Sequence, residues 1–458
     1  MNATCKLRIS QDHFKILFDH LFPGDGDEHG AVLLAGTSVS DGQTILHVRE
    51  VHLAAEGTDY VEGKIGYRAL TPQFIHRMIT RARDEKLAYL AVHNHASDRS
   101  VGFSRIDLDS HERGYPALLQ ISRGLPVGAL VLGTRSMEAD VWLKDGTRLG
   151  LESAIVVGKT IRRLTPRPRF STNGTANMFD RQIKMFGAGG QRALSESSVA
   201  ILGLGGIGSL VAEYVARLGV GRIYLVDDDH VEETNLSRII GAETADVVGH
   251  VPKVEVARRV ILQANPAADT ILIEGDFAKE SVVSRLTGVD YVFLAADSMR
   301  ARLVFNALVH QYLIPGVQLG SKIRPDEQGS LREVMSANRP VRPGKGCLWC
   351  NQLIDTNMLA KEAKTDEDRK AQAYGTEEPN PSVISLNAVS AAHAVNDFLL
   401  DFLCLRPEAE TLHYEHFHFL TSKRSLVEPR RDPDCPECSI TGSRYGRGDG
   451  IPLPTLEG

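Results

Sequence analysis

The sequence has few cysteines, few aromatic residues and no long apolar run. Cysteine occurs 6 times in 458 residues, and aromatic residues make up 6%. No stretch reaches the roughly 18 consecutive apolar residues that a membrane-spanning helix needs. The start of the chain lacks the apolar core and small-residue cleavage site of a secretory signal. We therefore expect no membrane segment and a cytoplasmic location.

The composition is that of a soluble globular protein, with 42% hydrophobic and 24% charged residues. A net charge of −6 gives no general reason to expect nucleic acid as a partner. The length exceeds one ordinary core, so two or three domains are expected.

Apolar strand patterns and one helical pattern at 71–86 predict a small α/β domain with a central sheet over residues 1–150. Residues 151–177 begin with a helix-like stretch and end in TPRPRFSTNGTAN, whose Pro, Ser, Thr, Asn and Gly content is typical of a linker. Residues 178–458 alternate strands and helices, including a helix at 253–264, which predicts a Rossmann-like, mainly parallel sheet. The polar segment 360–381 predicts a solvent-facing loop.

A glycine-rich turn follows the first strand of this second domain and opens a helix. Such a turn lets the backbone approach phosphates, while the helix N-terminus offers free N–H groups and partial positive charge. Asp227 ends the next strand, where a carboxylate can accept both hydroxyls of a ribose. The turn fits GxGxxG and contains Gly203, Gly205, Gly206 and Gly208. A nucleotide site is predicted, with an NAD-binding unit as the alternative to ATP.

The residues after the turn favour ATP. Asn235, Arg238 and Lys253 follow in quick succession, and Asp297 ends the strand DYVFLAADS. Cations offset the charge of a triphosphate and a carboxylate can hold Mg²⁺, as nucleotidyl transfer requires. Hydride transfer would not need this set.

This ordered set resembles the ubiquitin-activating superfamily, which includes the adenylyltransferases of molybdopterin and thiamine biosynthesis. The resemblance covers roughly residues 178–440, from FDRQIKMFGAGGQRAL through GLGGIGS, LVDDDHVEETNLSR, PKVEVAR and AADS. It implies ATP and Mg²⁺ as cofactors and a homodimer formed through the adenylation domain. The implied roles are ribose binding by Asp227, phosphate contacts by Asn235, Arg238 and Lys253, Mg²⁺ binding by Asp297, and a γ-phosphate contact by Arg181 across the dimer interface. Asp229 lies in the same LVDDD segment and is counted with the nucleotide-binding residues, whereas Ile239 departs from the family's usual Gln.

Four of the six cysteines form two CxxC pairs. The pairs are Cys347 with Cys350 and Cys435 with Cys438. In a large chain without a secretion signal, paired CxxC motifs favour metal over disulfides. Four thiolates complete a closed tetrahedral zinc site, and in the resembled family this zinc is structural. A redox CxxC is the alternative.

A second metal pattern lies in the first domain. His93 and His95 alternate along a strand, so both imidazoles can face one ion, and Asp107 at the start of the next helix can supply a third ligand. Three protein ligands leave a position for water, which is the catalytic arrangement. Glu28 is the candidate general base and Glu50 the fallback.

This pattern resembles the JAMM metallopeptidases, with a distant Glu, then HxH, a spacer, Ser, two residues and Asp. The resemblance covers about residues 12–145. It implies zinc on His93, His95 and Asp107, water activation by Glu28, and stabilisation of the tetrahedral intermediate by Ser104.

Together the two domains predict an enzyme that adenylates the C-terminal glycine of a ubiquitin-like protein and carries its own peptidase, which processes or deconjugates that protein. A conjugating enzyme is then a further partner. The alternatives are an activator of a sulfur-carrier protein in cofactor or cysteine biosynthesis, and a non-catalytic scaffold. Cys404, in an apolar stretch, is expected at a helix end packed in the core, which disfavours a thioester on this chain.

Overall fold

The structure, a computed structural model, describes residues 4–61, 68–97, 99–167, 177–326, 328–362, 381–407 and 411–456. The chain divides into two compact units. Unit 1 comprises Met1–Phe170, His310–Leu313 and Ile440–Pro452, and unit 2 comprises Ser171–Val309, Ile314–Ser439 and Leu453–Gly458. Within the described ranges, no helix combines the length and the apolar character needed to cross a membrane.

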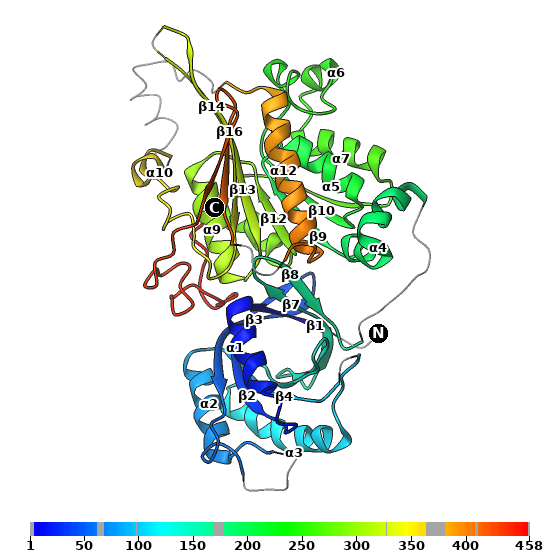
Figure 1. Ribbon diagram of the computed structural model, residues 1–458, viewed down its shortest axis with the longest axis vertical. Helices are drawn as coiled ribbons and strands as arrows, with labels where there is room; N and C mark the ends of the chain where they lie inside the picture. Colours follow the sequence, from blue (N-terminus) through cyan, green and yellow to red (C-terminus); the bar gives the residue numbers. More distant parts are fainter. Residues whose placement is uncertain are drawn as a thin grey trace. The chain divides into compact units, whose positions relative to one another are not determined.

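Unit 1 is built on an eight-stranded sheet that closes on itself. The strand order is β1-β3-β2-β4-β5-β6-β7-β8, and β1 also pairs with β7. Figure 1 shows these strands curving into a ring. The strands are β1 (Thr4–Ser10), β2 (Gly30–Ser40), β3 (Gln43–Leu53), β4 (Ala88–Asn94), β5 (Val127–Leu132), β6 (Met137–Trp142), β7 (Arg148–Val157) and β8 (Ile161–Leu164).

Helices cover both faces of this sheet, and the strand β2 carries apolar side chains on each of the two faces. Leu33 belongs to one core cluster with α1 (Gln11–Leu21), while Val32 and Leu34 belong to another with α2 (Pro72–Asp84) and α3 (Arg105–Ile121). Successive residues of a strand point to opposite faces, so the alternation assigns each helix its side. Each helix begins at a capping hydroxyl, contributed by Ser10, Thr71 and Ser104 respectively. The α/β expectation for residues 1–150 and its one named helix are confirmed.

The stretch after residue 150 is not helix-like, and that expectation was wrong. Residues 148–157 and 161–164 form β7 and β8, and β7 closes the sheet by pairing with β1. Its apolar residues alternate, with Leu149, Leu151, Ala154 and Val156 in the α1-side core. Long-range pairing with β1, which no local pattern reveals, decides the structure here.

A late segment of the chain also belongs to unit 1. Beyond Ala35, β2 no longer pairs with β4, which leaves that edge for residues 446–449. Gly36 donates its backbone N–H to Gly446 O at 3.2 Å, and Asp449 donates to Thr37 O at 2.8 Å. A Cβ on Gly36 would lie 2.3 Å from Gly446 O, so only glycine allows this approach. Residues 440–452 therefore complete the edge of the first sheet.

Unit 2 is built on a second eight-stranded sheet, with the order β11-β10-β9-β12-β13-β14-β15-β16. The strands from β11 to β13 pair in parallel, and β13 to β16 pair antiparallel. The expected mainly parallel, Rossmann-like sheet is confirmed for the first five strands. The strands are β9 (Ser198–Leu202), β10 (Arg222–Asp227), β11 (Asp269–Glu274), β12 (Tyr291–Leu294), β13 (Gly316–Pro325), β14 (Leu331–Val341), β15 (Tyr414–His418) and β16 (Lys423–Val427).

Helices cover both faces of this sheet too (Figure 1). Phe398 of α12 packs on Tyr291 and Phe293 of β12, whereas Phe305 of α9 packs over Gly316 of β13, so the two helices lie on opposite faces. The helices are α4 (Asp180–Ser195), α5 (Gly208–Leu218), α6 (Thr244–Val248), α7 (Lys253–Ala264), α8 (Glu280–Val283), α9 (Met299–Gln311), α10 (Thr356–Glu362) and α12 (Ile384–Phe402). The 3-10 helices are η1 (Asn177–Phe179), η2 (Glu233–Asn235) and η3 (Ser284–Leu286). The helix expected at 253–264 is confirmed, and most of the predicted loop 360–381 lies outside the described residues.

Candidate functional sites

The glycine turn connects β9 to α5. Gly203 adopts a φ of 87°, and a Cβ on Gly208 would lie 1.8 Å from Gly203 O, so the turn is too tight for larger residues. Asp227, at the end of β10, accepts hydrogen bonds from the N–H groups of Leu204 at 2.5 Å and Asp229 at 2.9 Å. Burial raises the pKa of Asp227, and the nearby Lys253 opposes that shift. The predicted ribose carboxylate therefore also fixes the shape of the turn.

A pocket of about 610 Å³ opens beyond the end of β10. Lys253, at the start of α7, is held in it by Asp229 at 2.6 Å and lies 3.8 Å from Asp227. The pocket therefore combines acidic groups with two of the predicted phosphate-binding cations. Its lining residues are Asp228, Asp229, His230, Val231, Glu232, Glu233, Asn235, Arg238, Val247, His250 and Lys253.

Asn235 and Arg238 are placed by η2 and the turn that follows it. The side chain of Asn235 is buried and accepts the N–H of Glu232 at 3.4 Å, which caps η2. The Cδ of Arg238 lies 3.4 Å from the Cβ position on Gly206, so this side chain borders the glycine turn. Ile239, where the resembled family has Gln, is buried in a small apolar cluster with Val231 and Val256. The isoleucine at this position therefore contributes to apolar packing.

Asp297 and Arg181 are both exposed. Asp297 comes three residues after the end of β12, at the carboxyl edge of the sheet and directly before α9. Arg181 lies in the first turn of α4. The strand order puts β12 and β10 on either side of β9, so Asp297 and the Lys253 pocket flank the glycine turn. The predicted nucleotide residues of β9, β10 and β12 thus share one edge of the sheet.

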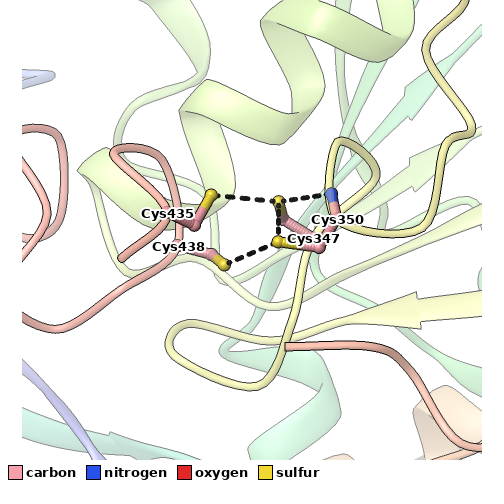
Figure 2. A group of neighbouring side chains, drawn as sticks. All are labelled: Cys347, Cys350, Cys435 and Cys438. Carbon is pink, nitrogen blue, oxygen red and sulfur yellow. Dashed lines mark hydrogen bonds between the residues drawn. The ribbon is translucent and has the colours of Figure 1, made fainter. Parts of the chain in front are cut away.

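The four paired cysteines converge as expected (Figure 2). The sulfur of Cys347 lies 3.5 Å from that of Cys350 and 3.8 Å from that of Cys435, and Cys350 lies 3.7 Å from Cys438. Zinc–sulfur bonds of 2.3 Å in a tetrahedron put sulfurs about 3.8 Å apart. The donor set and its spacing therefore fit a tetrahedral metal ion.

Cys404 differs from its expectation. It lies just past the end of α12, with a φ of 52°, and it is exposed rather than packed in the core. The apolar stretch before it is the buried face of α12, which ends at Phe402 and leaves the next residues at the surface.

A further group of potential ligands joins α12 to β15. His393 contacts Asp397 at 3.3 Å and Glu415 at 3.0 Å. Arg406 also pairs with Asp397, and Arg424 pairs with Glu415 at 2.6 Å. Burial alone would lower the pKa of His393, but hydrogen bonds to both carboxylates raise it to about 9. With a cation on each carboxylate, this group is an ion-pair network.

In unit 1, three predicted ligands converge at the end of β4. The Nε2 atoms of His93 and His95 lie 3.2 Å apart, and Asp107 Oδ2 lies 3.7 Å from the first and 3.8 Å from the second. Tetrahedral zinc with bonds near 2.05 Å separates its ligands by roughly 3.4 Å. Burial alone would raise the pKa of Asp107, but the nearby His93 and the hydrogen bonds from Ser104 hold that pKa well below its usual range. The three residues could hold one metal ion.

Ser104 and Asp107 also have a structural role at the start of a helix. Ser104 Oγ accepts the N–H of Asp107 at 3.2 Å and Asp107 Oδ2 accepts the N–H of Ser104 at 2.8 Å, which forms the capping box of α3. Ser104 Oγ also donates to Asp107 Oδ2 at 2.7 Å. Part of the SxxD pattern is thus explained by the start of a helix alone. In this geometry the single O–H of Ser104 is engaged in a hydrogen bond to Asp107.

Glu28 and Glu50, the two candidate bases, have different surroundings. Glu28 Oε1 lies 3.7 Å from His95 Nε2, and burial raises the pKa of Glu28. Glu50 accepts both guanidinium N–H groups of Arg81, at 2.7 and 3.0 Å, and contacts His52 at 2.8 Å. These bonds hold the pKa of Glu50 at about 2 against the effect of burial.

Asn94, between the two histidines, is a residue that the motif analysis missed. Its buried side chain accepts the N–H of His29 at 2.6 Å and donates to Asp27 O at 3.4 Å. These backbone groups belong to the two neighbours of Glu28, so Asn94 fixes the segment that carries the candidate base. The sequence signal for this role was a polar residue at the strand position between the two histidines, which points to the opposite face of the sheet.

Residues 179–437 match the model of the ThiF family, so the chain belongs to the ThiF family. Members of this family are ATP-dependent adenylyltransferases. Among solved structures, E. coli MccB with ATP is 22% identical, covering 58% of this chain and 75% of that one, with a TM-score of 0.46. PaaA is 19% identical over 57% of this chain and 86% of that one, with a TM-score of 0.45. A search of curated proteins found no match. Neither likeness is close enough to bear on substrate.

Proposed function

We propose that unit 2 adenylates the C-terminal glycine of a ubiquitin-like protein with Mg-ATP. Within the ThiF family, the observation that carries this for the present chain is the array around one glycine turn. It brings Asp227 and Lys253 to the end of β10 and Asp297 to the end of β12. A carboxylate, a cation and a further carboxylate are the groups that a ribose, a triphosphate and Mg²⁺ each require.

The chemistry follows from these positions. An oxygen of the substrate carboxylate bonds to the α-phosphorus, the bond from that phosphorus to the bridging oxygen breaks, and pyrophosphate leaves with the electron pair. Lys253 and Arg238 offset the charge of the departing pyrophosphate, and Asp297 would hold Mg²⁺, which supplies charge neutralisation when bound. Arg181 is exposed on α4, and in a homodimer it would contact the γ-phosphate of the ATP that the other copy of the chain binds.

The test is exchange of labelled pyrophosphate into ATP in the presence of a ubiquitin-like protein ending in glycine. Asp297→Ala should abolish exchange. Asp276→Ala removes a carboxylate from the loop after β11 that takes no part in the proposal, and it should leave the rate unchanged. Exchange at the wild-type rate in Asp297→Ala would refute the assignment.

We propose in addition that unit 1 is a zinc peptidase of the JAMM type, and that it cuts the same ubiquitin-like protein from a precursor or from a target. The observation that favours this is the convergence of His93, His95 and Asp107 with Glu28 beside them. Zinc, when bound there, polarises the scissile carbonyl and acidifies water. Glu28 takes the proton of the attacking water and returns it to the leaving nitrogen as the C–N bond breaks.

The remaining site residues have matching roles in this proposal. Glu28 serves as base in preference to Glu50, whose oxygens are occupied by Arg81. Ser104 would turn its hydroxyl from Asp107 to the oxygen of the tetrahedral intermediate. The four cysteines would hold a second, structural zinc.

Two alternative functions predict different experimental results. A sulfur-carrier protein is the alternative substrate, and it would give pyrophosphate exchange with a carrier but no conjugate. A non-catalytic scaffold would give neither exchange nor cleavage. Mass spectrometry of a precursor extended beyond its glycine, incubated with the protein, separates a peptidase from a docking domain.

A further inference from the structure

A cluster of hydrogen-bond donors lies on the α9 face of the second sheet, outside the pocket that holds Lys253. Gln318, Arg339 and Tyr414 stand side by side on β13, β14 and β15, because the register pairs Gln318 with Arg339 and Asn338 with Glu415. Asn338 faces α12, where it contacts Ser390, so its neighbour Arg339 faces α9. Arg302, in the first turn of α9, lies close enough for its charge to act on Arg339.

Among the described residues, both arginines in this cluster donate hydrogen bonds only to neutral groups, and the carboxylates of Asp297 and Glu362 act on Arg302 from a greater distance. Arg339 donates to Gln318 Oε1 at 2.7 Å and approaches His416 Nε2 at 3.4 Å, and Arg302 donates to Leu353 O at 2.9 Å. Burial lowers the pKa of Arg339 to about 10, and the charge of Arg302 adds to the effect. Two like charges are thus held close together in a partly buried place.

Three buried donor atoms here have no acceptor in the described part of the chain. They are Arg302 Nε, Arg339 Nε and Tyr414 Oη. A guanidinium has no acceptor atom, so nothing but an acceptor can satisfy it. Buried donors are nearly always satisfied, and two guanidinium groups close together call for an anionic acceptor. Tyr414 also lies near the sulfurs of Cys347, Cys350 and Cys438.

The position of the cluster indicates which anion. Gln318 is paired with Leu294, three residues before Asp297, so the cluster lies at the carboxyl edge of the sheet. The strand order β10-β9-β12-β13-β14 puts Lys253 and Arg238 on one side of Asp297 and Arg339 on the other. In an in-line displacement, the attacking oxygen enters opposite the leaving oxygen. With pyrophosphate at Lys253, the attacking carboxylate must come from the side of β13 and β14.

We propose that Arg302 and Arg339, with Tyr414, form the site that receives the carboxylate of the acyl substrate before it attacks ATP. This rests on the adenylation proposed above and assigns it a carboxylate-recognition site. The site binds a negatively charged C-terminus and therefore binds the same C-terminus more weakly when it is an amide. Charge-assisted hydrogen bonds from a planar guanidinium give this discrimination its strength.

The probe is a fluorescein-labelled octapeptide ending in Gly-Gly, prepared with a free C-terminal carboxylate and as the C-terminal amide. Binding of each form to the full-length protein is measured by anisotropy in the presence of Mg²⁺ and a non-hydrolysable ATP analogue. The wild type should bind the acid at least about tenfold more tightly than the amide. Arg339→Gln should bind both forms as the wild type binds the amide, and Arg339→Lys should keep part of the preference.

The matched control is Lys322→Gln, which removes an exposed cation from the neighbouring strand β13. It should keep the full preference, and all variants should bind the ATP analogue with wild-type affinity, which shows that they are folded. A wild type that binds both forms equally, or neither, would overturn the proposal, as would an unchanged preference in Arg339→Gln. A wild type that prefers the acid without incorporating pyrophosphate into ATP would instead count against adenylation of such chain ends.

Discussion

Replacing Asn94 by Ala tests whether the residue between the two histidines positions the base of the proposed peptidase. The substitution removes the acceptor of the His29 N–H at 2.6 Å and the donor to Asp27 O at 3.4 Å. His29 is buried, so its N–H loses a partner where water does not replace it readily. An unsatisfied buried donor costs about 1–3 kcal/mol.

The effect on cleavage should exceed the effect on stability. The segment 27–29 carries Glu28, and a displacement of about 1 Å at a reacting group can cost about a hundredfold in rate. A stability loss of about 1–3 kcal/mol lowers Tm by several degrees and leaves nearly all molecules folded at 25 °C. The three metal ligands are untouched, so the zinc content of unit 1 should stay at its wild-type value.

The assay compares cleavage of an extended ubiquitin-like precursor, zinc content and Tm for three variants. Asn94→Asp keeps the acceptor for His29 but loses the donor to Asp27, and it should fall between wild type and Asn94→Ala. Asp25→Asn alters a surface contact to the His29 ring and serves as the control with a near-normal rate. Full activity in Asn94→Ala, or a rate loss matched by an equal loss of zinc, would refute positioning of Glu28 through Asn94.

Three further predictions follow from the two units. Glu28→Ala should slow hydrolysis by several orders of magnitude with zinc retained and adenylation intact, whereas Asp297→Ala should do the reverse; loss of both activities in either variant would contradict separate sites. Elemental analysis should find two zinc ions per chain. His95→Ala should lose about one equivalent, and Cys350→Ser should lose the other together with stability, so a protein without zinc after chelator-free purification would refute both sites. For His393, the folded pKa of about 9 exceeds the ordinary 6.5. Its contribution to stability is therefore complete below about pH 6.5 and is lost as pH rises through 9, and urea titrations of His393→Gln should show a flatter decline over that window.

The residues of the three candidate sites occur in short sequence motifs. The glycine turn, the two CxxC pairs and HxH with SxxD each depend on backbone spacing that a few residues determine. The regular alternation of β9, β10 and α7 likewise predicted a parallel sheet, because buried parallel strands and amphipathic helices have recognisable periods. For the parallel sheet and for the convergence of these motif residues, the sequence by itself was sufficient.

Features that depend on distant pairing were decided by the tertiary structure. Residues 151–157 and 161–164 lie in strands because β7 pairs with β1, which is distant in the sequence, and residues 446–449 bond to the edge of β2 that β4 leaves open. Glu50 was removed as a base by Arg81, which lies on another element. Arg302 and Arg339 are single arginines in sequence, and only the order of strands and the face of α9 bring their charges together. A motif specifies the contacts of residues that are close in the sequence. The charge and burial around a side chain depend instead on residues that the fold brings from distant parts of the chain.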